Sequence, residues 1–453
     1  MSEELFAPIF IPDELREATG GPAWLQAMLD VEAALARAEA KAGILSEEDA
    51  EAIAAHCDAE RFDIEEIGAA ARNPGSPVPP MVKSLTEKVR ETSEEAARHV
   101  HKGATSQDIL DTAAMLVFRR TTDILLADVD ALAAACARLA DGHRSTVVAG
   151  RTLMQQALPT TFGLKAAGWL VAVVEGRHRI VYVGSGLSAQ LGGAAGTLAS
   201  LVDDGLDVLR EFANELGLAE PVVPWHTSRA RVADLGDVLS TVSGVAGKIA
   251  TDIVLMSQTE VGEVSEPSGG GRGGSSTLPH KRNPVLSVAA IANARRVHAL
   301  VGTLHSTMLH EHERAAGAWH SEWEPLSDAL ALSGGAASMM REAVEGLEVH
   351  VEKMRENLEI TGGLLLAENI TTMAAESLGR MKAHELVKAA AHRALDNGSE
   401  FRGELLADDG LREALSEDEI NFALEPGNYL GSSDGFIDRA LELCETEGIE
   451  WKL

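Results

Sequence analysis

The chain has 453 residues, enough for several domains or for one large helical bundle with smaller attachments. Aromatic residues make up 4% of it and only two are tyrosine, which argues against a β-sandwich or a barrel. The net charge of −31 would repel nucleic acids and anionic membranes, so neither is an expected partner. An acidic substrate would therefore need positive charge gathered locally.

Cysteine usage and the first residues indicate the compartment. Cys57, Cys136 and Cys444 are scattered and lack the spacing of a metal site, so a reducing cytoplasm suits the chain better than a disulfide framework. The start, MSEELFAPIF, is acidic and lacks the basic segment and apolar run of a signal peptide. No apolar run is expected to reach membrane-spanning length, so we expect a soluble, cytoplasmic protein.

Helical patterns cover nearly the whole chain. Up to about residue 110 they are short, including a run of apolar residues from Trp24 to Leu35 and a helix from Met81 to about Ala97. Abundant Ala, Leu, Glu and Arg favour helices throughout, and no strand alternation competes with them. Long helical patterns then follow over 108–142, 160–216 (two helices), 230–261, 285–309 and 322–358.

Long Ala-rich helices with few breakers predict a bundle. From residue 359 the helices shorten again and turn clusters separate them. We therefore predict an all-α protein with a helical N-terminal domain over 1–110, a central long-helix bundle over 111–358 and a helical C-terminal domain over 359–453.

A glycine-rich stretch, Glu266–Pro284, reads EPSGGGRGGSSTLPHKRNP. Its five glycines keep the backbone free of a single conformation, so we expect a mobile loop. Asn283 and Pro284 are typical of a helix start, as N-cap and first helical residue. Hydroxyls, Lys281 and Arg282 beside the positive end of a helix suit an anionic substrate. A nucleotide-binding P-loop is excluded because no Gly-Lys-Ser/Thr follows the glycines, and a linker rarely ends against a helix cap in this way.

The end of this stretch, GSSTLPHKRNP, resembles the loop motif of the fumarase/aspartase superfamily, with Leu278 in place of the usual Met. The resemblance implies a homotetramer with a central helical core, active sites shared between subunits, and no metal or organic cofactor. It also implies that Ser275 exchanges a proton α to a carboxylate and that Ser276 binds the substrate. Lys281, Asn283 and the helix start at Pro284 would stabilise the negative charge that develops.

A second motif, HxGxTSxD, runs from His101 to Asp108. Ser106 or Asp108 can cap the helix that follows, and a capped loop alone would explain these residues. The pattern resembles the first substrate-binding segment of the superfamily. By that resemblance, Thr105 and Ser106 hold substrate carboxylates, and His101 is a catalytic residue beside them.

A third motif, GRTLMQQALPTT, begins at Gly150 and resembles the second segment of the superfamily. In lyases of the superfamily this segment carries a His that works with a Glu seven residues after the loop lysine. Here those positions are Leu153 and Val288. Loss of both partners avoids a buried unpaired carboxylate, so we expect an apolar floor and changed chemistry. The resemblance also assigns substrate binding to Arg151, Thr152 and Gln155.

Two further stretches, PWHTSRARV and EHERAAGAWHSEWE, place basic residues in motif-like segments and predict a focused anion site. Arg229 and Arg314 are the predicted substrate-binding residues there, although a helical-face ion pair stays open for Arg314. No metal site is expected, because His310 and His312 lack HExxH spacing.

Together with the variant Gly-Arg-Thr-x-x-Gln-Gln, these stretches resemble the 3-carboxy-cis,cis-muconate cycloisomerase branch of the superfamily. The resemblance implies an intramolecular lyase that forms 4-carboxymuconolactone reversibly in protocatechuate breakdown. Two alternatives stay open: an adenylosuccinate lyase-type elimination that releases fumarate, and a non-catalytic helical scaffold. Intact Ser275, Lys281 and Asn283 argue against the scaffold.

Overall fold

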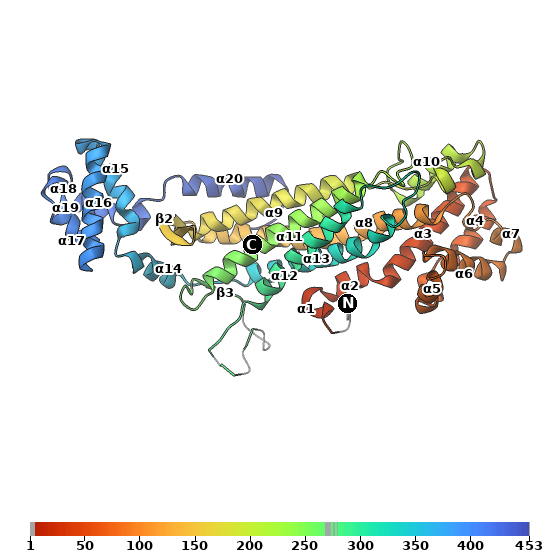
Figure 1. The fold of residues 1–453 in the computed structure, drawn as a ribbon, viewed down its shortest axis with the longest axis horizontal. Coiled ribbons are helices and arrows are strands. Elements are labelled where there is room, and N and C mark those ends of the chain that lie inside the picture. Colours follow the sequence, from red (N-terminus) through yellow and green to blue (C-terminus); the bar gives the residue numbers. More distant parts are fainter. Residues whose placement is uncertain (1–4, 268–272, 275–276, 279, 453) are drawn as a thin grey trace. The chain divides into compact units, whose positions relative to one another are not determined.

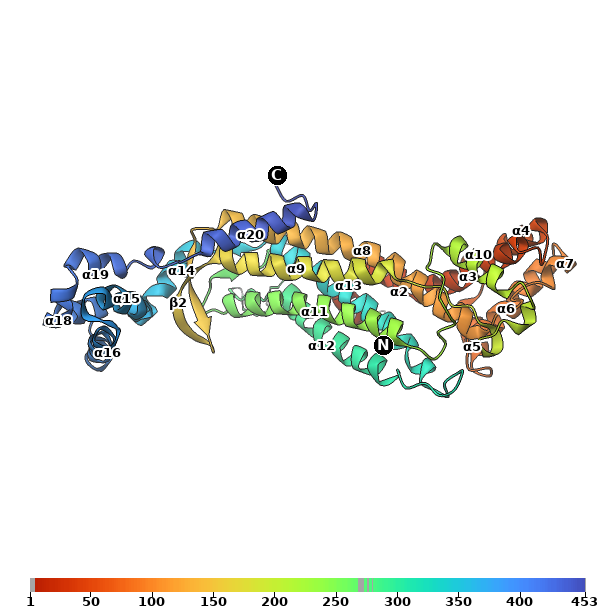
Figure 2. The same ribbon diagram turned by 90° about the horizontal axis from the view of Figure 1, so that it is seen from above.

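A computed structural model describes residues 5–267, 273–274, 277–278 and 280–452. Over these residues the chain forms twenty α-helices and two small antiparallel β-pairs (Figures 1 and 2). The predicted all-α fold is confirmed. Local propensity explains why it could be predicted, since Ala, Leu, Glu and Arg all favour helix.

The chain divides into two compact units. Unit 1 comprises Met1–Val129, Glu175–Gly247 and Ala289–Met339, and unit 2 comprises Asp130–Val174, Lys248–Val288 and Met340–Leu453. The boundaries fall inside the long helices, so each of these contributes residues to both units. The predicted division into 1–110, 111–358 and 359–453 stays a prediction.

Five long helices form the bundle segments of the units, and within each unit they run alongside one another (Figures 1 and 2). They are α8 (Ser106–Gly142), α9 (Phe162–Ser185), α11 (Ala230–Met256), α12 (Val285–Ser306) and α13 (Trp323–Glu345). The helix expected over 322–358 ends early and restarts as α14 (Val351–Leu358). Gly346 directly follows the end of α13, and glycine is needed there because a Cβ would lie 2.7 Å from the Pro267 side chain. Strand β4 (Glu348–Val349) then pairs with β3 (Val264–Ser265).

Helix α11 is long and apolar enough to cross a membrane by length and composition alone. The expectation that no segment reaches that length is therefore wrong. Val232, Leu235, Val242 and Ile249 of this helix are nevertheless buried in the protein. Such burial is typical of the core helix of a soluble bundle.

The N-terminal part of unit 1 is built from short helices around α3. Helix α3 packs against α4 and α10 and buries Leu25, Met28 and Leu35. Side-chain caps begin several of the others, as Ser46 does for α4. The bounds are α1 (Ala7–Phe10), α2 (Asp13–Thr19), α3 (Gly21–Lys41), α4 (Glu47–Ala54), α5 (Ile64–Ala71), α6 (Val78–Arg90), α7 (Glu94–Ala97) and α10 (Gly205–Leu216).

Unit 2 contains a β-hairpin that the sequence patterns did not predict. Strand β1 (Val147–Thr152) pairs antiparallel with β2 (Gln155–Thr161), with an irregularity between Ala149 and Arg151. The turn consists of Leu153 and Met154, both with positive φ, instead of the Asn-Gly or Gly-containing pair that usually marks such a turn. The missing turn signal explains why the hairpin was overlooked.

The C-terminal helices of unit 2 share a small core of their own, centred on Ile370, Val387, Phe401 and Leu411. They are α15 (Ala367–Leu378), α16 (Arg380–Asn397), α17 (Phe401–Leu406), α18 (Asp409–Ala414) and α19 (Glu417–Ala423), followed by α20 (Ser433–Thr446). The chain also has short 3-10 helices at Ala59–Arg61, Gly193–Ala195, Ala199–Leu201, Trp319–Ser321, Glu359–Thr361, Leu364–Leu366 and Pro426–Asn428.

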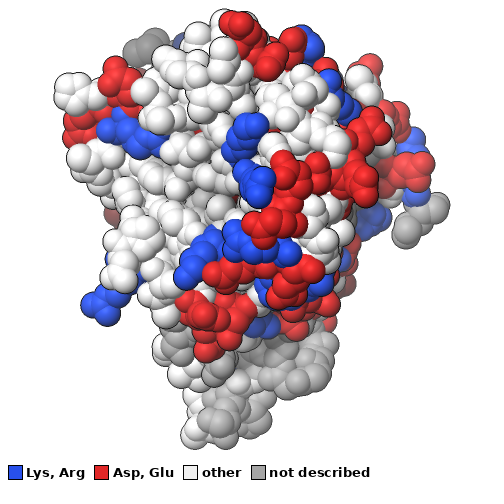
Figure 3. Space-filling model, turned by 90° about the vertical axis from the view of Figure 1, so that its right-hand side faces the viewer, with Lys and Arg blue, Asp and Glu red and all other residues white. Residues whose placement is uncertain are grey.

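Surface charge is intermixed on the end face of unit 1 that carries α4, α7 and α10. Figure 3 shows Lys and Arg side chains among Asp and Glu there, with no broad basic surface on that face.

Candidate active site

The imidazole of His101 contacts the buried carboxylate of Glu32. His101 Nδ1 lies 2.7 Å from Glu32 Oε1, and Glu32 on α3 is 1% exposed. Burial alone would lower the pKa of His101, but the charge and hydrogen bond of Glu32, with a contribution from Asp108, raise it above its ordinary value. The backbone of His101 has φ +61°, an uncommon conformation for a residue other than glycine. The ring is therefore fixed, and it favours the cationic form.

Asp108 organises the start of α8. Its fully buried carboxylate accepts hydrogen bonds from the backbone N–H groups of Thr105, Gly192 and Gly193 and lies 2.7 Å from His226 Nε2. These four donors satisfy both oxygens. Asp108, which the sequence suggested as a helix cap, thus links the start of α8 to the segments that contain Gly192 and His226.

Arg314 and Thr105 are brought together as predicted site residues. The Arg314 guanidinium donates to the Thr105 hydroxyl at 3.1 Å and to the carbonyls of Gly193 and Ala194, both at 3.1 Å. No carboxylate of the described residues pairs with it, so the helical-face ion pair considered for Arg314 does not form there. Ser106, the first residue of α8, is half-buried beside Thr105. A cation, two neighbouring hydroxyls and His101 make this part of unit 1 suited to a carboxylate.

Arg229, a predicted substrate-binding residue, is buried and paired with carboxylates of the protein. It is 3% exposed and lies between two buried carboxylates, donating to Asp111 at 2.8 and 3.0 Å and through Nε to Glu322 at 3.1 Å. Burial alone would lower the pKa of Arg229, but Asp111 and Glu322 raise it. Trp319 also donates to Asp111 at 3.0 Å. The predicted contact of Arg229 with substrate stays a prediction, and in this chain both ends of the guanidinium are bonded to buried carboxylates.

Arg151 in unit 2 is likewise committed to a carboxylate. Its guanidinium bonds Glu263 at 2.6 and 3.0 Å, and Asn357 donates to the same Glu263 at 2.9 Å. Glu263 is fully buried, so this pair anchors strand β1. Thr152 and Gln155 flank the hairpin turn and are exposed. Their predicted contact with substrate, and that of Arg151, stay predictions.

The glycine-rich stretch is described only in part. Ser275 and Ser276, its predicted catalytic and substrate-binding serines, lie outside the described residues. At its end Lys281 is exposed, and Asn283 donates through Nδ2 to the carbonyl of Gly273 at 3.0 Å. A Cβ on Gly273 would lie 2.5 Å from the Asn283 carbonyl, so only glycine allows this closure. Asn283 thus links the end of the stretch to Gly273 in its middle.

The positive end of α12 is already occupied. Buried Glu266 accepts hydrogen bonds from the backbone N–H of Leu286 at 3.0 Å and of Ser287 at 2.7 Å. A carboxylate there satisfies helix amides that have no partner within the helix. The expectation that the helix start would stabilise substrate charge is therefore wrong.

Leu153 and Val288 do not form a buried floor in this chain. Leu153 at the hairpin tip is 97% exposed, and Val288 is 54% exposed. A Glu at position 288 would therefore meet solvent in the single chain, and the stability loss expected from a buried unpaired carboxylate does not follow. Both positions nevertheless carry aliphatic side chains where the lyases carry a His and a Glu.

Four carboxylates that hold predicted site residues were not predicted from sequence: Glu32, Asp111, Glu263 and Glu322. Each pairs with a residue far along the chain, so no local spacing reveals it. The one available signal was a charged residue on an otherwise apolar helical face, as at Glu32 among Val31, Ala33 and Leu35.

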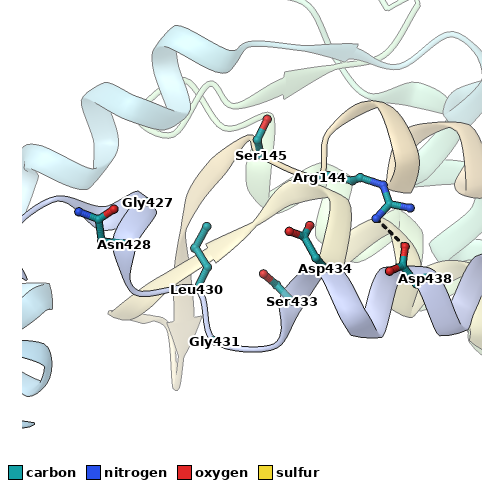
Figure 4. A pocket seen from close by; sticks show the side chains of 9 residues that line it. All are labelled: Arg144, Ser145, Gly427, Asn428, Leu430, Gly431, Ser433, Asp434 and Asp438. Carbon is teal, nitrogen blue, oxygen red and sulfur yellow. Dashed lines mark ion pairs between the residues drawn. The ribbon is translucent and has the colours of Figure 1, made fainter.

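A cavity of about 620 Å³ opens elsewhere in unit 2, lined by Arg144, Ser145 and residues of the 427–438 segment. Figure 4 shows the Arg144 guanidinium directed at Asp438, and the two are 2.7 Å apart. Hydrogen bonds from Arg144 to Asp141 and Asp438 raise the pKa of this arginine. The cation is neutralised, and none of the predicted site residues lines the cavity, so we do not assign the substrate to it.

Comparison with known proteins identifies the family. Residues 12–299 match the family described as Lyase, and residues 363–440 match Adenylosuccinate lyase C-terminus. The chain belongs to the fumarase/aspartase superfamily of lyases. The resemblance drawn from the loop motif is thereby confirmed.

Relatives of this superfamily match over nearly full length. The chain is 44% identical to a nitrosuccinate lyase of Streptomyces davaonensis, over 96% of this chain and 94% of the relative. It is 43% identical to a 3-carboxy-cis,cis-muconate cycloisomerase of Bradyrhizobium diazoefficiens, over 98% of each. The crystal structure of 3-carboxy-cis,cis-muconate lactonizing enzyme from Pseudomonas putida matches with a TM-score of 0.93 at 40% identity, covering 98% of this chain and 99% of that one.

One buried carboxyl beside the site yields a pH-dependent prediction. Glu39 lies two turns after Glu32 on α3, is fully buried, and has no hydrogen-bond partner among the described residues. Burial raises its pKa to about 8, against the opposing charge of Lys102. Because the ordinary value is about 4.3, its contribution to stability is complete below about pH 4 and is lost as the pH rises towards 8.

Glu39→Gln should therefore raise the free energy of unfolding by about 2 kcal/mol or more at pH 8, and by about 1 kcal/mol at pH 5. Urea unfolding at the two pH values measures the difference. The exposed Glu48→Gln on α4 is the matched control and should change little at either pH. An equal effect of Glu39→Gln at both pH values would contradict the raised pKa.

Proposed function

We propose that the protein interconverts 3-carboxy-cis,cis-muconate and 4-carboxymuconolactone. The observation that carries this proposal is the pair Leu153 and Val288, aliphatic where lyases of the superfamily place a His and a Glu. The cationic His101 and the Arg314–Thr105 contact in unit 1 add a place for a substrate carboxylate. The cycloisomerase relatives match the chain from end to end.

The chemistry requires charge stabilisation more than water activation. In the lactone-forming direction, a carboxylate oxygen of the substrate bonds to the alkene carbon β to another carboxylate. The alkene electron pair moves onto that carboxylate, which gains a second negative charge, and the α carbon then takes up a proton. Because the nucleophile is internal, no water needs to be activated, and preorganised donors supply most of the rate enhancement.

Residue roles follow from this reaction. We assign proton transfer at the α carbon to Ser275 and stabilisation of the doubly charged carboxylate to Lys281. Asn283 is engaged with Gly273, so its role is to shape the loop around those two residues. Thr105, Ser106 and Arg314 bind a second carboxylate, with His101 as the neighbouring cation.

A second candidate is elimination of nitrite from nitrosuccinate, favoured by the 44% identity to a nitrosuccinate lyase. Purified protein should be assayed with 3-carboxy-cis,cis-muconate by loss of diene absorbance, with nitrosuccinate by nitrite release, and with adenylosuccinate by fumarate release. We expect kcat/KM for the muconate to exceed the others by about 100-fold or more, about 3 kcal/mol in transition-state binding. Faster nitrite release would replace this proposal with the second candidate.

We also propose a cytoplasmic homotetramer with shared active sites. The hairpin tip supports a subunit contact, since Leu153 and Met154 are 97% and 70% exposed and apolar. The predicted site residues are also divided between the units: Thr105 and Ser106 belong to unit 1, and Lys281 belongs to unit 2.

Sharing predicts complementation between inactive variants. Ser275→Ala and the double variant Thr105→Val/Ser106→Ala should each be inactive alone, and mixing them under conditions that exchange subunits should restore part of the activity. Mixed tetramers would contain some sites with no substituted residue. Recovery is measured by the muconate assay, with subunit exchange verified by mass spectrometry. Verified exchange without recovery would contradict sharing.

A further inference from the structure

The burial of the Glu32 carboxylate is not explained by any contribution to the stability of the fold. It lies on α3 among buried Val31, Ala33 and Leu35, and it is 1% exposed. One oxygen bonds His101, and the other has no hydrogen-bond partner among the described residues. Burying a carboxylate with a single partner costs several kcal/mol, and an apolar residue would pack there at lower cost. A role in the reaction would account for its presence.

The contact determines which nitrogen of His101 can meet a substrate. Nδ1 is bound to Glu32 at 2.7 Å, so a proton resides there and Nε2 is the ring nitrogen left for a ligand. The His101 side chain is 20% exposed, so the ring is accessible despite this contact. A buried carboxylate behind an imidazole fixes its tautomer and stabilises the imidazolium.

The charged groups around the pair are few. Glu32 and Asp108 act on His101, and both favour its cation. Glu39 and Cys57 sense the charge of Glu32, which helps to raise the pKa of each. Asp108 is itself committed to His226 and three backbone amides. Glu32 is therefore the acid of this group that bonds directly to His101.

We propose that Glu32 is a positioning residue for the reaction, keeping His101 protonated on both ring nitrogens, with Nδ1–H bonded to Glu32 and Nε2–H directed to a substrate carboxylate. The inference rests on the proposed function in that the ligand of His101 is a carboxylate. Glu32 itself touches no substrate. It acts by keeping a cation available as the pH rises, where an isolated histidine would lose its charge.

The test compares Glu32→Gln with Glu32→Asp. Gln preserves the shape, and its carbonyl oxygen can accept a hydrogen bond from Nδ1–H, but it lacks the charge, whereas Asp keeps the charge on a shorter side chain. For the parent, kcat/KM should fall as the pH rises through the raised pKa of His101. In Glu32→Gln this fall should begin about one pH unit lower, giving roughly a tenfold loss at pH 8 and little change at pH 6. Glu32→Asp should restore part of the shift.

Two controls isolate the pair. His101→Gln should abolish the alkaline fall, which shows that it belongs to His101. Glu39→Gln removes another buried carboxyl of the same helix that does not contact His101, and it should leave the pH profile within about twofold of the parent. A profile of Glu32→Gln that coincides with that of Glu39→Gln would overturn the proposal.

A binding measurement separates this inference from the proposed function. Propane-1,2,3-tricarboxylate is titrated calorimetrically at pH 8 in two buffers of different ionisation enthalpy, which reports protons taken up on binding. The parent should take up a smaller fraction of a proton than Glu32→Gln and should bind several-fold more tightly. If the parent does not turn over the muconate but this difference appears, the role proposed for Glu32 is supported and the proposed substrate is wrong. If turnover is normal but Glu32→Gln matches the parent in both measurements, the role proposed for Glu32 is contradicted and the proposed function is not.

Discussion

Replacing Arg229 with Met is expected to lower the free energy of unfolding by about 3–5 kcal/mol, the largest stability effect expected of any single change considered. The change leaves Asp111 and Glu322, both under 5% exposed, facing each other without the cation between them. Trp319 and Gln107 still donate to Asp111, Thr307 still donates to Glu322, and His310 Nε2 lies 3.3 Å from Glu322. None of these groups bridges both carboxylates as the guanidinium does. Chemical unfolding at fixed protein concentration, followed by tryptophan fluorescence, measures the loss.

A matched control separates this burial effect from the loss of any arginine pair. Arg402 pairs with Glu417 on the surface, where the side chains are 43% and 63% exposed, and Arg402→Met should cost less than about 1 kcal/mol. The double variant Arg229→Met/Glu322→Gln should recover at least about 1 kcal/mol, because one unpaired charge is removed with its partner. Were Arg229→Met as stable as the control but with a raised KM, Arg229 would bind substrate, as its sequence motif had suggested.

The fold could be predicted because its information is local. Residue propensities and apolar spacing within each helix predicted the long helices to within a few residues at most ends. The exceptions are places where contacts between residues far apart in the sequence influence the local structure. Gly346, next to the helix break, is approached closely by Pro267, and the hairpin depends on pairing between Val147 and Thr161 around a turn of Leu153 and Met154.

Part of the candidate site could be predicted from the sequence, because some of its residues lie in local motifs. Cations and hydroxyls in motifs, such as Arg314 and Thr105, are found together as expected. The carboxylates that decide what those cations do are supplied by other elements. Arg229 looked available in sequence, yet Asp111 and Glu322 enclose it. The start of α12 looked like an anion site, yet Glu266 already fills it.

These carboxylates also bear on a chain of net charge −31 that acts on an acidic substrate. Arg151 is neutralised by one buried acid and Arg229 lies between two, so neither adds attraction for an anion. Under the proposed function, the positive charge that attracts the substrate is that of Arg314, whose partners are a hydroxyl and two carbonyls, of His101 and of Lys281. Attraction is therefore focused in three side chains instead of spread over a basic surface.

Replacing Lys281 with Met is expected to lower kcat by about 100-fold to 1,000-fold while KM changes by less than about threefold. Lys281 is exposed beside the closure formed by Asn283 and Gly273, so the substitution should not disturb the fold. The ammonium matters most when the second negative charge develops on the substrate carboxylate. Its loss therefore raises the energy of the transition state more than that of the bound ground state. Steady-state kinetics with 3-carboxy-cis,cis-muconate at constant ionic strength measures both parameters.

Arg282→Met is the matched control, since it removes one positive charge from the neighbouring position. Arg282 lies 3.8 Å from Glu348 with both side chains largely exposed, so a partner shares its charge and solvent screens it. Its substitution should change kcat by less than about threefold. If Lys281→Met raises KM and spares kcat, the ammonium serves binding, and stabilisation of the doubly charged carboxylate belongs to another donor. If both variants lose kcat equally, the general field of the loop, and not a specific contact of Lys281, stabilises the transition state.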